Sequence, residues 1–120
     1  MVRLVAFSAV LALSALPVLA SEAAIKARQG NMQTYALNLG VLGSMAQGRT
    51  PYDAALAQEA ADNLFHMTRN SQLGMWPEGS ASGQMAGTRA APAVWANNAD
   101  FLAAYANLQA GAEAMQAAAG

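Results

Sequence analysis

Cysteine is absent from the 120-residue sequence, and histidine occurs once, at His66. Without cysteine these residues form no disulfide, no thiolate metal site and no thiol nucleophile. A single histidine cannot build a histidine-rich zinc site. His66 lies two residues after Leu64, away from the centre of the apolar stripe of its helix. We therefore expect it on the exposed flank of that helix rather than in a binding site.

The sequence also lacks an excess of charge of either sign, since six basic residues stand against seven acidic ones. No Lys/Arg cluster occurs. This balance argues against nucleic acid and against an anionic membrane surface as partners. The sequence contains no phosphate-binding glycine loop, no nucleophile elbow and no metalloprotease motif. No pair of carboxylates has the spacing of an acid and its base, so we expect a protein that is not an enzyme.

Aromatic residues are few, with three Phe, two Trp and three Tyr, and alanine is the commonest hydrophobic residue. Alanine is the best helix former and buries little area per residue. The composition therefore predicts helices that pack closely side by side.

Residues 1–20 have the pattern of a secretory signal peptide. Arg3 supplies the positive charge, residues 4–16 form an apolar run too short to span a bilayer comfortably, and Pro17 breaks this run. Cleavage after Ala20 would leave a mature domain over residues 21–120. We predict a location outside the cytoplasm, the periplasm in a bacterium, with no membrane attachment after cleavage; an uncleaved anchor is the alternative.

Three stretches have the spacing of apolar residues that predicts amphipathic helices, namely residues 21–46, 51–71 and 98–119. Thr50 as N-cap with Pro51 next predicts the start of the second helix, and Asn97 that of the third. The predicted stripes are Ile25, Met32, Ala36, Leu39, Gly43 and Ala46; Ala57, Ala60, Ala61, Leu64 and Met67; and Phe101, Tyr105, Leu108, Ala112, Met115 and Ala119.

The segment 72–97 is rich in glycine, proline and serine and contains both tryptophans, Trp76 and Trp95. Connections of this length are often functional. The indole rings either pin the loop onto the core, which we favour, or line a flat ligand.

Together these elements predict an all-α fold of the antiparallel four-helix-bundle type, with only the first three helices in this sequence. The short link 47–49 makes the first two an αα-hairpin, and the long loop must cross the end of the bundle. Three such helices leave an open apolar groove, which a cofactor, a partner or more chain must fill.

Arg28 lies three residues after Ile25 and four before Met32, on or beside the first stripe. Periodicity favours a side chain whose charged end reaches water. The alternative is a partly buried cation that lacks its anion.

Four motifs, in order along the mature sequence, resemble those of cytochromes c′. They are IKARQGNM from Ile25, TPYDAA from Thr50, WPEGS from Trp76, and TRAAPAVW from Thr88 followed by Asp100-Phe101. The resemblance implies a periplasmic four-helix bundle with one covalent haem c. It further implies electron transfer or nitric oxide handling, and a homodimer formed through the first two helices.

The resemblance also implies which residues surround the haem. Arg28 and Gln29 match a pair near the haem propionates, and Met32 matches the apolar residue over the distal face of the iron. Thr88 and Arg89 match loop residues that touch the haem edge. Trp76, Trp95 and Phe101 match an aromatic wall. The full set is Arg28, Gln29, Met32, Trp76, Thr88, Arg89, Trp95 and Phe101.

One feature of the family is missing from the sequence. Cytochromes c′ attach haem through Cys-x-x-Cys-His on the final helix, where the histidine is the proximal ligand. No cysteine is present here, so no metal ligand is assigned. We interpret the sequence as a cytochrome c′ fragment that ends before the attachment helix. The alternatives are a haem-free helical binding module and a non-covalent haem held by Met32 and His66.

Overall fold

The computed structural model describes residues 15–72 and 74–119, with side chains from residue 21 onward. The described residues form the helices α1 (Ala15–Ala46), α2 (Ala54–Thr68), α3 (Ala93–Ala96) and α4 (Asn98–Ala118), and no strand is assigned among them. The predicted all-α class is therefore confirmed. Most of the predicted signal peptide lies outside the described residues. The helix α1 runs continuously past Ala20, and cleavage there stays a prediction.

The turn between α1 and α2 corrects the predicted start of the second helix. Asp53, and not Thr50, is the N-cap, and its carboxylate accepts a hydrogen bond from the Leu56 N–H at 3.0 Å. Pro51 therefore lies in the link, before the first turn of α2. The link reverses the chain at Gly48, whose φ of +66° is one that glycine adopts without strain. An aspartate side chain caps a helix well, so the helix begins where Asp53 can reach its free N–H groups.

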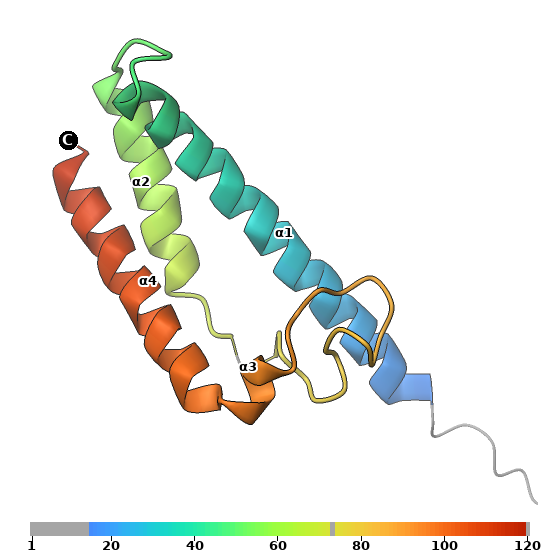
Figure 1. Ribbon diagram of the computed structural model, residues 1–120. Helices are drawn as coiled ribbons and strands as arrows, with labels where there is room; N and C mark the ends of the chain where they lie inside the picture. The colour runs from blue at the N-terminus through green and yellow to red at the C-terminus, as the bar shows by residue number, and fades with distance from the viewer. Residues whose placement is uncertain (1–14, 73, 120) are drawn as a thin grey trace, which may run out of the picture.

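The helices lie in the order α1, α2, α4, with α2 in the middle (Figure 1). The segment from residue 69 to 97 crosses the end of the bundle, as the long loop was expected to do (Figure 1). It lies against α1 at Arg28 and Gln29. The short helix α3 follows Pro92 and directs the chain into α4. Asn97 precedes α4 as predicted, although its side chain makes no capping hydrogen bond.

The core is an alanine seam along α2. The predicted stripe of α2 is buried at Ala57, Ala60, Ala61 and Leu64, and Thr68 extends it. At the hairpin end, Ala57 and Ala61 pack with Ala119, and Leu42 and Met45 of α1 cover this cluster. Small side chains let three backbones approach closely, as the composition predicted.

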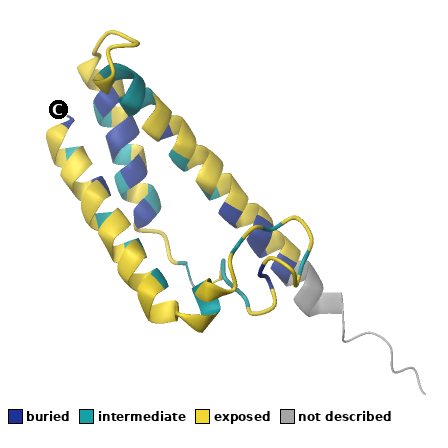
Figure 2. Ribbon diagram, viewed as in Figure 1, coloured by how far each residue is buried: buried dark blue, intermediate teal, exposed yellow. Residues whose placement is uncertain are grey.

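The stripes of α1 and α4 are buried only in part (Figure 2). Met32 on α1 is 57% exposed and Leu108 on α4 is 44% exposed, and Leu39 and Met115 are exposed too. These side chains follow the predicted periodicity, but the backbones of α1 and α4 each lie close to α2 and not to one another. The predicted open apolar groove is therefore present between them. No helix among the described residues combines the length and apolar character that crossing a membrane requires.

Candidate functional site

Arg28 is buried against the loop that follows α2. Its side chain is 6% exposed. Nη1 donates to the Met75 carbonyl oxygen at 2.9 Å and to Ser80 Oγ at 2.8 Å. Nη2 donates to the Ser80 carbonyl oxygen at 3.0 Å and to Thr88 Oγ1 at 3.3 Å. The expectation of a charged end in water is wrong, because loop oxygens replace the water that a guanidinium would otherwise bind.

The partners of Arg28 are neutral oxygens rather than an anion. Burial lowers the pKa of the Arg28 guanidinium, yet arginine is not deprotonated in proteins, so the group stays a cation. The ring of Trp76 lies 4.5 Å from the guanidinium carbon, which adds a cation–π contact. The site thus holds a buried positive charge that hydrogen bonds and an aromatic face stabilise.

Gln29 and Thr88 extend this attachment of the loop. Gln29 Nε2 donates to the Gly87 carbonyl oxygen at 2.6 Å. Thr88 Oγ1 also accepts from the Ala90 N–H at 3.1 Å, so that its hydroxyl both receives Arg28 and shapes the loop backbone. Arg89, the next residue, is exposed. The two neighbouring residues of the motif therefore differ in environment: Thr88 faces Arg28, and Arg89 faces solvent.

Three aromatic residues form a wall at this end of the bundle. The ring centroids of Trp76 and Phe101 are 4.9 Å apart, and those of Trp76 and Trp95 are 6.0 Å apart, both edge to face. Trp95 Nε1 donates to the carbonyl oxygen of Trp76 at 3.1 Å. The favoured interpretation, in which the indole rings pin the loop, is confirmed. Trp76 and Phe101 also face a cavity, so the wall can line a ligand as well.

Two cavities adjoin Arg28 and Trp76. One, of about 210 Å³, lies between α1 and α4. The other, of about 610 Å³, lies between α1 and the loop. Trp95 stands behind Trp76 and lines neither cavity. The remaining predicted site residues line one or both, and they are Arg28, Gln29, Met32, Trp76, Thr88, Arg89 and Phe101.

Tyr35, Gln72 and Tyr105 line the smaller cavity and were not predicted as site residues. Tyr105 donates to the Thr68 carbonyl oxygen at 2.7 Å and accepts from Gln72 Nε2 at 3.2 Å. Burial and the neighbouring Tyr105 phenol raise the pKa of Tyr35. Tyr35 Oη is buried without a hydrogen-bond partner among the described residues. Helical spacing could have found Tyr35, because it follows Met32 by three residues on the same face of α1.

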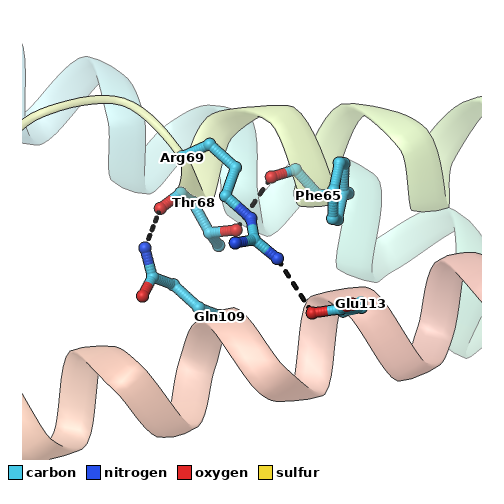
Figure 3. A network of polar contacts seen from close by, with 5 residues as sticks. All are labelled: Phe65, Thr68, Arg69, Gln109 and Glu113. Atoms are coloured by element: carbon cyan, nitrogen blue, oxygen red, sulfur yellow. Dashed lines mark hydrogen bonds and ion pairs between the residues drawn. The ribbon is translucent and has the colours of Figure 1, made fainter.

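The same Thr68 carbonyl is the centre of a polar contact between α2 and α4 (Figure 3). It also accepts from Gln109 Nε2 at 2.8 Å, and beside it Arg69 Nη2 meets Glu113 Oε2 at 2.9 Å. The Thr68 hydroxyl donates to the Phe65 carbonyl oxygen at 2.8 Å. These bonds use the free carbonyl groups at the end of α2, and they fix the side of the bundle next to the cavity.

The described residues fit part of a haem site. A flat aromatic ring system with carboxylates suits an aromatic wall near the exposed Arg89. Ligands to iron are not gathered there: no group of three His, Cys, Asp or Glu side chains is positioned to hold a metal in the described part of the chain. His66 is exposed as predicted and packs edge to face on Phe65. It lines neither cavity that Met32 lines, so the structure does not support these two residues as a ligand pair.

Comparisons with known proteins agree with the geometry. The family model for cytochrome c′ matches residues 23–120. Cytochrome c-554 of Cereibacter sphaeroides is 40% identical over 99 residues, which are 82% of this chain and 74% of that protein. Cytochrome c′ of Rubrivivax gelatinosus is 35% identical over 95 residues, 79% of this chain and 71% of that protein. A solved structure of cytochrome c′ from Rhodobacter Spheriodes has a TM-score of 0.81 at 32% identity, covering 83% of this chain and 77% of that one.

The chain therefore belongs to the cytochrome c′ family, as its motifs indicated. Its fold is that of the four-helix-bundle cytochromes, and its class of function is that of haem-binding electron carriers. Haem c is the cofactor that the family implies. The 120 residues contain no cysteine, so they cannot form the thioether bonds of haem c by themselves.

Proposed function

We propose that this protein is an exported cytochrome c′ that carries electrons in the periplasm and binds nitric oxide at its haem iron, rather than turning over an organic substrate. The observation that supports this most is the buried Arg28 beside the wall of Trp76 and Phe101, because both adjoin cavities between α1, α4 and the loop. When bound, haem supplies an iron that alternates between two oxidation states.

The residues of this chain have distinct tasks in that proposal. Trp76 and Phe101 line the smaller cavity and would exclude water from the haem ring, which would help to set its redox potential. Met32 lines both cavities and would limit access to the iron. The exposed Arg89 at the edge of the larger cavity would orient carboxylates.

We further propose that a Cys-x-x-Cys-His helix, which these 120 residues do not contain, supplies covalent attachment and packs into the groove. Two observations support this: the chain spans 74% of the cytochrome c-554 that it matches, and Met32, Leu39, Leu108 and Met115 are exposed along α1 and α4. The coding sequence that follows codon 120 tests the proposal directly. An amphipathic helix with this motif is the expected finding; a stop codon followed by unrelated sequence contradicts it.

Haem content is the measurement that tests the function. We expect the full gene product, isolated from the periplasm of a bacterial host, to contain one haem per chain by pyridine haemochrome, and acid extraction to leave this haem on the protein. Nitric oxide should shift its absorption bands. Trp76→Ala should lower the haem content, whereas Leu102→Ala, which removes an exposed side chain of α4, should not. A fully folded product without haem would contradict the proposal and favour the haem-free binding module instead.

We also propose that two copies associate through α1 and α2. Leu37 is 67% and Tyr52 65% exposed, and with the exposed Leu56 they border a hollow on the side of the hairpin. Exposed apolar groups of this size on neighbouring helices are typical of a contact between subunits. We expect a dimer in analytical ultracentrifugation that Leu37→Glu converts to a monomer. Leu102→Glu is the matched control on α4, and a wild-type monomer would contradict the proposal.

A further inference from the structure

Arg28 connects α1 to three residues of the loop. Four of the five N–H groups of a guanidinium lie on its terminal nitrogens, and the two terminal nitrogens have four acceptors, at Met75, Ser80 and Thr88. Ser80 is itself fully buried, and its hydroxyl donates onward to the Pro77 carbonyl oxygen at 2.7 Å. The loop between residues 75 and 88 is therefore closed around one side chain.

The same guanidinium also fixes the aromatic wall. It lies over the ring of Trp76 at 4.5 Å, and Trp76 contacts the rings of both Trp95 and Phe101. A side chain that holds the loop backbone on either side of Pro77 and also stacks on Trp76 restricts the direction of that ring. Arg28 is thus the residue of α1 that orients Trp76 within the aromatic wall.

A carboxylate that approached Arg28 would meet donors already in use. It could bind the terminal nitrogens only by displacing a loop oxygen, which would leave a buried acceptor without a donor. Arg89 lines the larger cavity too but is exposed, so it meets a carboxylate without this cost. The two arginines of the site are therefore not equivalent.

We infer that Arg28 is a positioning residue that acts through Trp76: it holds residues 75–88 and the indole ring against α1, so that the wall is formed before a ligand arrives. A preformed wall lowers the ordering cost of binding. The inference rests on the proposed function only in taking this wall as the side of the site that faces haem.

The test uses the full chain with Arg28→Gln and Arg28→Lys, in the absence of added haem. Hydrogen exchange is followed at the amides of Ser80, Ser82 and Met85, which donate to Pro77, Ala90 and Ala81. The exciton signal of the Trp76–Trp95 pair in circular dichroism reports the direction of the indole ring. We expect both variants to speed exchange at these amides by at least about tenfold and to weaken the exciton signal, because lysine lacks the planar fork of donors. The amides of α2 should be unaffected.

Two matched variants keep the test decisive. Lys26→Gln removes the same charge from an exposed position of α1 and should change neither signal. Ser80→Ala removes one acceptor of Arg28 and should speed exchange in the loop alone, even if Arg28→Gln unfolds the chain. Full retention of both signals in Arg28→Lys would overturn the inference, because charge would then suffice. So would an unchanged loop in Ser80→Ala. Haem content, measured separately, tests the proposed function, and neither result decides the other.

Discussion

The helices α2 and α4 have similar alanine-rich sequences but very different surroundings (Figure 2). Buried residues recur along the whole of α2, whereas Ala112 is the one buried residue within the described bounds of α4. The reason is the arrangement of the helices, since α2 lies between the long helices α1 and α4, whereas α4 has α2 as its one long neighbour and otherwise contacts the short α3. The comparison shows that composition makes both helices, and that placement alone decides which of them forms the core.

A larger side chain should destabilise α2 much more than α4, and this is the largest difference that we expect between the two helices. Ala61 on α2 is fully buried, so Ala61→Leu has no space for its extra methyl groups and should lower the free energy of unfolding by about 1–3 kcal/mol. Ala103→Leu on the exposed face of α4 should change it by less than about 0.5 kcal/mol. Denaturant titration of both variants measures the difference. Equal effects at the two positions would show that α4 is covered as closely as α2.

Removing the hydroxyl of Tyr105 should lower the free energy of unfolding, whereas removing that of Tyr35 should not. Tyr105→Phe removes the hydrogen bond to Thr68 that joins α4 to α2 and should cost about 1 kcal/mol. Tyr35→Phe removes a buried hydroxyl without a described partner and should cost nothing, or should stabilise the chain by up to about 1 kcal/mol. Unfolding in urea tests both, and a loss at Tyr35 equal to that at Tyr105 would mean that the Tyr35 hydroxyl is bonded.

The contact between α2 and α4 should also depend on pH through Asp62. Hydrogen bonds from Gln116 and then Gln58, together with His66, hold the pKa of this carboxyl below its usual range. A lowered pKa in the folded state means that the carboxylate stabilises the fold above the unfolded pKa, about 4. This contribution is lost as the pH falls through the folded pKa.

Asp62→Asn tests this dependence. The variant should lose part of the decline in stability below about pH 4 that the wild type shows. Thermal unfolding at a series of pH values gives both curves. Parallel curves for the two proteins would show that Asp62 has the same pKa in both states.

The smallest effect is expected at the ion pair of Arg69 and Glu113 (Figure 3). The two side chains are 45% and 66% exposed, so water and salt screen their attraction. Glu113→Gln should change the free energy of unfolding by less than about 0.5 kcal/mol, and the change should vanish at high salt. A salt-independent loss above 1 kcal/mol would identify this pair as part of the packed contact between α2 and α4.

Local features of the sequence predicted a large part of this molecule. The three long helices, the central stripe of α2, the exposed His66 and the tryptophan-pinned loop are all confirmed. The motifs around Arg28 and Trp76 led to the family and to residues that meet at two cavities. The start of α2 was misplaced because Thr50 and Asp53 are both good caps, and local pattern does not say which of them the chain uses.

The sequence by itself determined the helices, because apolar spacing and helix propensity act within a few residues of each other. Tertiary structure alone decided the surroundings of Arg28, whose acceptors are 47 to 60 residues away along the chain. It also decided that Tyr35 Oη is buried without a described partner, and that α2 rather than α4 is central. The physical reason is that burial and hydrogen-bond partners depend on which distant segments pack together, which periodicity within one helix does not encode.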